Sequence, residues 1–188
     1  MAFDPRGDMC LGFWRDVYEA DVLDWPQNAN ILEVGCAEAD WIGPMKAEKP
    51  DLFITGLDWR ACERPAATTL IKGDVLIHEF TESTFDGIVL VSALEHIGLG
   101  AYDDPRDEDG DIHAMARFAS WLKPGGWVYA DVPYRPDGYL VNEQFRGYDD
   151  RAIEDRLTVH PLQLTWRREF ASSHRDGPYI AMIWRRSV

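Results

Sequence analysis

A chain of 188 residues is long enough to bury a core, and we expect a single domain over residues 1–188. Its hydrophobic content of 46% and charged content of 28% are ordinary for a globular protein. The formal net charge of −14 disfavours a nucleic-acid partner, and no apolar run approaches the roughly 20 residues that span a bilayer. We therefore expect neither nucleic acid nor a membrane as a partner.

The cysteines bear on the compartment. Three of them (Cys10, Cys36 and Cys62) lie far apart in the sequence, with no CxxC pair, which argues against structural zinc and against a disulfide framework. The opening residues, MAFDPRGDMC, do not have the pattern of a signal peptide. Both features predict a cytoplasmic protein.

The predicted elements begin with an N-terminal helical segment, residues 1–28, in which apolar residues recur at helical spacing from Leu11 to Trp25. Residues 30–34 form an apolar run typical of a strand buried on both faces. Small residues follow it, and they leave the backbone amides and the positive end of the next helix open to a ligand. That helix starts near Asp40 and turns three apolar residues inward: Trp41, Ile42 and Met45.

The rest of the chain alternates strands and helices. Further strands are predicted at 52–57, 70–72, 85–91, 127–132, 162–170 and 179–184, and further helices at about 62–69 and 111–122, with Asp111 as the N-cap of the second. Residues 92–110 are irregular, 139–157 are mixed, and the polar turn 172–178 joins the last two strands. This pattern predicts an α/β fold, a doubly wound and mostly parallel seven-stranded sheet with an antiparallel C-terminal hairpin and helices on both faces.

Ligands of open α/β sheets bind at the carboxyl ends of the strands, so the residues that follow each strand are the candidates for a site. Asp58 lies about two dozen residues after the glycine turn, where a carboxylate can accept hydrogen bonds from both hydroxyls of an adenosine ribose. Trp59 is placed to lie against an adenine ring, and Asp74 to accept from the adenine amino group. Structural roles, as turn or capping residues, are the alternatives for all three.

The candidates for acid–base chemistry follow the strand 85–91. His96 is the best general base, because a neutral imidazole can take a hydroxyl proton near pH 7, and Glu95 can orient it. The alternative is that the Glu-His pair only fixes the loop. Further, second-rank candidates are expected near the same carboxyl ends of the strands: Tyr102, His113, Asp131 and Tyr134.

An acidic run follows, in which six of the nine residues from Asp103 to Asp111 are Asp or Glu. Three interpretations are open: a solvated loop with helix-capping aspartates, a surface that binds a polyhydroxylated or cationic acceptor, and a hard-metal site built from carboxylate oxygens. The run contains only a fragment of a calcium-loop motif, and we assign no metal ligands.

Five segments in this order, ILEVGCAEA, LDWR, KGDV, FDGIVLVSALEHIG and LKPGGWVYADVP, resemble the class I S-adenosylmethionine-dependent methyltransferases over about residues 29–134. The resemblance implies S-adenosylmethionine as the cofactor. It implies that the methionine portion of this cofactor is flanked by Glu33 and by the turn of Gly35, Cys36 and Ala37. It places the ribose on Asp58 with Trp59 nearby, the adenine on Asp74 and Val75, and the reacting centre beside Ser92 and Ala93.

The expected function is methyl transfer to a small-molecule or carbohydrate-like hydroxyl or amine. Segments similar to Glu95–Asp111 occur in a little-characterised branch of the superfamily that we associate with surface-carbohydrate modification. Ala37 and Ala39 stand where the family usually has glycine, which leaves a non-catalytic binding module of the same fold as the alternative. An NAD-dependent enzyme is a third possibility, but the chain lacks the G-x-G-x-x-G spacing. The oligomeric state does not follow from the sequence.

Overall fold

The computed structural model of the chain describes residues 23, 25–37, 41–61, 69–170 and 178–188. The predicted helix from Leu11 to Trp25 lies almost wholly outside this part of the chain. The predicted helix at 62–69 and the predicted turn at 172–178 also lie outside the described residues, except for residues 69 and 178.

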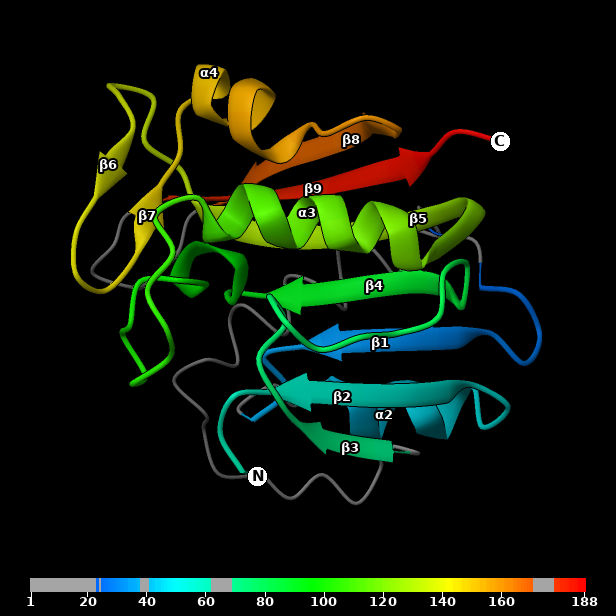
Figure 1. Ribbon diagram of the computed structural model, residues 1–188. Coiled ribbons are helices and arrows are strands. Elements are labelled where there is room, and N and C mark those ends of the chain that lie inside the picture. Colours follow the sequence, from blue (N-terminus) through cyan, green and yellow to red (C-terminus); the bar gives the residue numbers. More distant parts are fainter. Residues whose placement is uncertain (1–22, 24, 38–40, 62–68, 171–177) are drawn as a thin grey trace.

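A seven-stranded sheet forms the centre of the molecule, with the strand order β3-β2-β1-β4-β5-β9-β8 (Figure 1). The first five strands in the order are parallel to one another, and β9 lies antiparallel between β5 and β8. This confirms the predicted fold class, including the antiparallel terminal hairpin. The strands are β1 (Asn30–Val34), β2 (Phe53–Asp58), β3 (Thr69–Lys72), β4 (Phe85–Val91), β5 (Leu122–Pro133), β8 (Leu162–Phe170) and β9 (Tyr179–Arg186).

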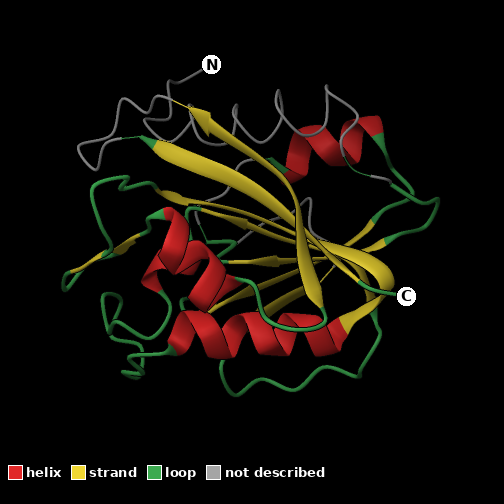
Figure 2. Cartoon of the chain, turned by 90° about the horizontal axis from the view of Figure 1, so that it is seen from above, coloured by secondary structure: helices red, strands yellow, loops and turns green. Residues whose placement is uncertain are grey.

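Helices cover both faces of the sheet (Figure 2). On one face, α3 (Gly110–Trp121) and the short helical turns α4 (Asp150–Ala152) and η3 (Ile153–Leu157) bury their apolar residues in the larger core cluster. On the other face, α2 (Ile42–Glu48) contributes to a second cluster. The inward-facing residues predicted for the start of this helix are confirmed, since Trp41, Ile42 and Met45 are all buried.

Two elements differ from the prediction. β5 begins at Leu122, which pairs with Phe85, so Pro124–Gly126 lie within the strand as an irregularity of its register and not in a turn between helix and strand. Gly125 provides the positive φ of +78° that this irregularity needs. The segment predicted as mixed contains a separate two-stranded sheet of β6 (Leu140–Val141) and β7 (Arg146–Gly147).

The carboxyl ends of β1, β2, β3 and β4 all point to the same edge of the sheet (Figure 1). The short helical turn η2 (Leu94–His96), the start of α3 and the β6–β7 hairpin lie at that edge too. The fold therefore brings the turns after the parallel strands together with the hairpin.

Candidate functional site

The turn after β1 packs its backbone against the turn after β4. Gly35 has a φ of +82°, and a Cβ placed on it would lie 2.6 Å from the Cβ of Ala93. Its amide donates to the carbonyl of Leu57 at 2.9 Å. Only glycine fits this position, because it needs both the left-handed conformation and the close approach. Gly35 and Ala93, both predicted site residues, are thus in contact.

Cys36 and Glu33 are buried beside this turn. A Cβ on Gly56 would lie 2.8 Å from Sγ of Cys36, so the thiol is packed against β2. Glu33 is only 1% exposed, and its Oε1 accepts a hydrogen bond of 2.8 Å from the indole of Trp41. Glu33 therefore fixes the start of α2 in this structure, and its predicted place beside a methionine portion stays a prediction.

Asp58 connects the ends of β1 and β2. Its Oδ2 accepts from the amide of Ala37 at 2.9 Å, and its Oδ1 accepts from the amide of Arg60 at 2.7 Å and from Nε of the same arginine at 3.3 Å. Each carboxylate oxygen has two lone pairs, so Oδ2 keeps capacity for one further donor. The carboxylate is 5% exposed, whereas Trp59 beside it is 37% exposed. This arrangement is compatible with the predicted ribose and adenine roles.

Asp74 organises the turn after β3. Its Oδ1 accepts from the amide of Leu76 at 2.8 Å, and its carbonyl accepts from the amides of Ile77 and His78. Val75 is buried in the larger core cluster. The structural role weighed for Asp74 is thus present, and its adenine role remains untested.

The turn after β4 is held by two buried carboxyl groups. Ser92, with a φ of +46°, donates from its amide to Oδ1 of Asp131 at 2.6 Å and from its hydroxyl to Oε1 of Glu95 at 2.7 Å. Tyr129 donates to the other oxygen of Asp131 at 2.9 Å. Burial, together with the nearby charge of Glu95, raises the pKa of Asp131 to about 8, although the hydrogen bonds from Ser92 and Tyr129 oppose this. Asp131 is therefore protonated at neutral pH.

His96 lies between Glu95 and the β6–β7 hairpin. Its Nδ1 is 2.5 Å from the carbonyl oxygen of Gln144, and its Nε2 is 3.8 Å from Oε1 of Glu95. Its ring meets the ring of Tyr102 edge-on with centroids 5.5 Å apart, and the guanidinium of Arg60 lies 4.4 Å above that tyrosine ring. The predicted Glu95–His96 pair is thus brought together, and contacts run from it through Tyr102 and Arg60 towards Asp58.

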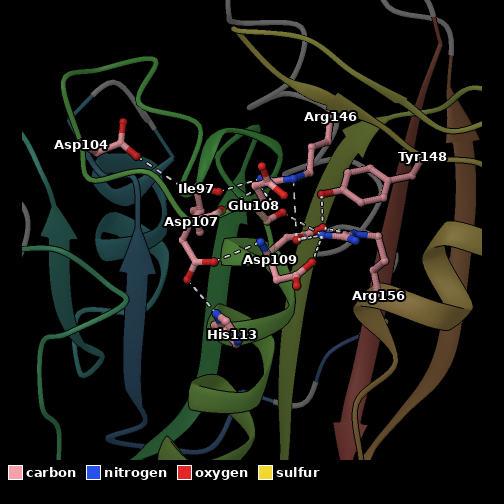
Figure 3. Close-up of polar contacts among 11 residues, drawn as sticks. Ile97, Asp104, Asp107, Glu108, Asp109, His113, Arg146, Tyr148 and Arg156 are labelled. Carbon is pink, nitrogen blue, oxygen red and sulfur yellow. Dashed lines mark hydrogen bonds and ion pairs between the residues drawn. The ribbon is translucent and has the colours of Figure 1, made fainter.

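The acidic run is held by arginines (Figure 3). Asp111 is buried in the first turn of α3 and receives two hydrogen bonds from Arg156, at 2.7 and 2.9 Å, and one from Tyr148 at 3.0 Å. The prediction of Asp111 as an N-cap is wrong, because the cap position is Asp109 and the Asp111 carboxylate binds side chains instead. Arg146, also buried, donates to the carbonyls of Ile97, Asp107 and Glu108.

Other carboxylates of the run bond to the loop itself. Asp104 accepts from the amides of Gly98 and Tyr102, and Asp107 accepts from the amide of Asp109 and from Nδ1 of His113 at 2.7 Å. The hydrogen bond from His113 lowers the pKa of Asp107. Among the described residues, no group of three or more His, Cys, Asp or Glu is arranged to hold a metal ion. These contacts favour a structural role for the run.

Tyr134, a second-rank candidate, is buried and donates to Asp150 at 3.1 Å. Burial raises its pKa, and so does this hydrogen bond to Asp150. Three residues at this edge of the sheet were not among the predicted site residues. They are Gln144, which contacts His96, Arg146, which bonds to Ile97, and Arg156, which bonds to Asp111. Their sequence signal was weak, because Arg156 and Asp111 are 45 residues apart and Gln144 acts through its backbone.

Comparisons with known proteins agree with this fold. A family model described as "Caenorhabditis protein of unknown function, DUF268" matches residues 72–153, which is less than half of the chain, and no curated protein matches. The 1,6-didemethyltoxoflavin-N1-methyltransferase of Burkholderia thailandensis, solved with S-adenosylhomocysteine, is 16% identical, with a TM-score of 0.67 over 97% of this chain and 87% of that one.

Two further solved structures are similar. The N-methyltransferase NodS of Bradyrhizobium japonicum WM9, also with S-adenosylhomocysteine, is 20% identical, with a TM-score of 0.57 over 84% of this chain and 78% of that one. The [4+2]-cyclase SpnF is 14% identical, with a TM-score of 0.69 over 100% of this chain and 86% of that one. In the described residues no helix has the length and apolarity to cross a membrane. The chain has the Rossmann-like fold of the class I S-adenosylmethionine-dependent methyltransferases.

Proposed function

We propose that this protein binds S-adenosylmethionine at the carboxyl edge of β1, β2, β3 and β4 and transfers its methyl group to a small-molecule or carbohydrate-like hydroxyl or amine. The observation that supports the proposal is the contact between the turns that follow β1, β2 and β4 at this edge. There the Gly35 turn packs on Ala93, and Asp58 bonds to the amide of Ala37. The similar methyltransferases solved with S-adenosylhomocysteine support the choice of cofactor.

The residues present fit such a cofactor. Gly35 has no side chain, the thiol of Cys36 packs against β2, and Oδ2 of Asp58 keeps one lone pair for a ribose hydroxyl. The exposed Trp59 offers a ring to the adenine. The bound cofactor would supply a methyl group on a cationic sulfur, which is already a strong electrophile. The protein then has to align the acceptor and remove a proton.

His96 is the proposed base, and Glu95 the residue that stabilises its charged form. Glu95 is fully buried, and its Oε1 lies 3.8 Å from Nε2 of His96. A carboxylate near an imidazole favours the imidazolium that forms when a proton is accepted. A single domain over 1–188, a cytoplasmic location and the absence of nucleic-acid and membrane partners remain proposals from the sequence.

A non-catalytic or non-methylating role is the second candidate. SpnF, whose fold is similar, is described as a [4+2]-cyclase, so this fold also supports other chemistry. A protein that bound S-adenosylmethionine tightly but methylated nothing in a broad acceptor screen would fit this candidate better.

The test is calorimetric titration of S-adenosylmethionine and S-adenosylhomocysteine into wild type and Asp58→Ala, with NAD as the control ligand. We expect the substitution to weaken binding about tenfold or more, because it removes hydrogen bonds to a charged group. Glu82→Gln, a change at an exposed glutamate, serves as the matched control. Because Asp58 also holds the Ala37 amide, the melting temperature of each variant is measured without ligand. If neither adenosyl ligand binds the wild type, the proposal fails.

A further inference from the structure

The β6–β7 hairpin is held firmly beside His96. Its turn is closed by Oδ1 of Asn142, which accepts from the amides of Gln144 and Phe145 at 2.8 and 2.9 Å. Arg146, the next residue, donates to the carbonyl of Ile97 at 2.6 Å and so joins the hairpin to the residue that follows His96. The turn and the imidazole are therefore fixed relative to each other.

An open pocket of about 500 Å³ lies beside this contact, lined by His96 and the turn residues Asn142–Phe145, of which the first three are exposed. Its size falls within the range of small-molecule sites. Glu143 provides a carboxylate and Phe145 an aromatic ring, and no Lys or Arg is among the described residues that line it. An anionic ligand would meet the carboxylates of Glu143 at the wall and Glu95 next to His96, with Arg135, 5.9 Å from the centroid of the Phe145 ring, as the opposing cation. A neutral or cationic ligand would not be repelled by the two carboxylates.

The hydrogen bond to Gln144 selects one tautomer of His96. A backbone carbonyl can only accept, so Nδ1 must carry the proton in the 2.5 Å contact. In the neutral imidazole the lone pair is then on Nε2. Among the described residues, the charged or titratable groups around this ring and its pocket are Glu95, Glu143, Tyr102, Arg60 through the tyrosine ring, and Arg135, whose guanidinium lies 5.9 Å from the centroid of the Phe145 ring.

We propose that this pocket is the site of the methyl acceptor, and that the acceptor is a neutral or cationic hydroxyl compound whose proton is taken by Nε2 of His96. The inference rests on the proposed methyl transfer and adds the place and charge of its substrate. The acceptor oxygen bonds to the methyl carbon while the carbon–sulfur bond breaks and its electron pair stays on sulfur. The hydroxyl proton passes to Nε2.

The charge preference is tested with three phenols that differ only in their side group: 4-methylphenol, tyramine and 4-hydroxyphenylacetate. Each is titrated into the ¹⁵N-labelled protein saturated with S-adenosylhomocysteine. We expect millimolar binding of 4-methylphenol and tyramine that shifts the amide signals of residues 142–145, and at least about tenfold weaker binding of the carboxylate. Preference for the carboxylate, shifts confined to other parts of the chain, or no binding by any of the three would overturn the proposal.

Glu143→Gln provides a matched variant, because Glu143 is exposed and its loss should not disturb folding. This variant should weaken the binding of tyramine about two- to fivefold and leave the binding of 4-methylphenol unchanged. The control variant Glu82→Gln should change the binding of neither phenol. Equal effects of Glu143→Gln on both phenols would contradict a charge contact in the pocket.

The base is tested through the nitrogen signals of His96, which report which ring atom carries the proton. We expect the neutral imidazole to carry its proton on Nδ1, and the signal of Nε2 should move when 4-methylphenol binds. A dominant Nε2-protonated form would refute the role of Gln144. Binding of S-adenosylhomocysteine is measured first. If the protein does not bind it, the proposed function fails. If the protein binds it but the amide signals of residues 142–145 do not respond to the phenols, only the proposed acceptor site fails.

Discussion

Replacing Asp131 by Asn should make the protein more stable at alkaline pH than the wild type. Asp131 is fully buried and accepts hydrogen bonds from the amide of Ser92 and the hydroxyl of Tyr129. An asparagine has nearly the same shape, and its Oδ1 can still accept from Ser92 while its amide donates to the tyrosine oxygen. It therefore imitates the protonated aspartic acid at every pH.

The magnitude follows from the pKa of about 8 for Asp131 in the folded protein, compared with about 3.9 for an unfolded aspartate. Between these values the folded state holds a proton that the unfolded state has lost, so rising pH destabilises the fold. The contribution of Asp131 is fully present below about pH 4 and is lost as the pH rises through about 8. Each pH unit in this window corresponds to about 1.4 kcal/mol, which gives an upper bound of about 4 kcal/mol from pH 5 to pH 8.

The assay is urea unfolding of both proteins at intervals from about pH 5 to about pH 8. Groups such as Asp107, whose pKa is lowered by His113, contribute the opposite dependence, but equally in both proteins. Asp137→Asn, at an exposed position, controls for the change in net charge. Parallel stability curves for wild type and Asp131→Asn would refute the raised pKa of Asp131.

Four further substitutions test the packing and the charge network. Arg156→Met leaves the buried Asp111 carboxylate without its two-bond partner and should cost roughly 3 kcal/mol in urea unfolding; a change below about 1 kcal/mol would show that Tyr148 and Arg146 suffice. Gly87→Ala places a Cβ 2.3 Å from the Trp127 ring and should lower stability by about 1–3 kcal/mol, whereas Gly43→Ala, in an exposed part of α2 with nothing within 4 Å, should raise it by up to about 1 kcal/mol. Gly35→Ala should lower the melting temperature and also reduce the gain from added S-adenosylhomocysteine, and an unchanged ligand-induced gain would argue that the turn does not contact the ligand.

The strands β1 and β4 were predictable because burial on both faces leaves a nearly uninterrupted apolar run. β1 and β4 have the bounds that their runs indicated, Asn30–Val34 and Phe85–Val91. The β6–β7 hairpin could not be predicted, because each of its strands has only two residues and so short a segment shows no alternation of apolar and polar residues. Its position depends on Arg146 and not on its own sequence pattern.

The site was predictable only in part, for a related reason. The chain order of the strands and their parallel direction place Gly35, Asp58 and Ala93 at one edge, and the contacts among the turns agree with this. The partners of Asp111 and His96 come from residues 45 and 48 positions further along the chain. One of these partners is a backbone carbonyl, which every residue possesses, so no residue type could mark it in advance.

The contact between Gly35 and Ala93 limits how this chain can diverge. Because a Cβ at position 35 would lie 2.6 Å from the Cβ of Ala93, position 35 cannot gain a side chain without moving the turn after β1 away from the turn after β4. Among homologues that keep this geometry, position 35 should therefore stay glycine, even if the surrounding loop varies freely in length and charge. A homologue with a larger residue at position 35 would be expected to hold its two turns further apart.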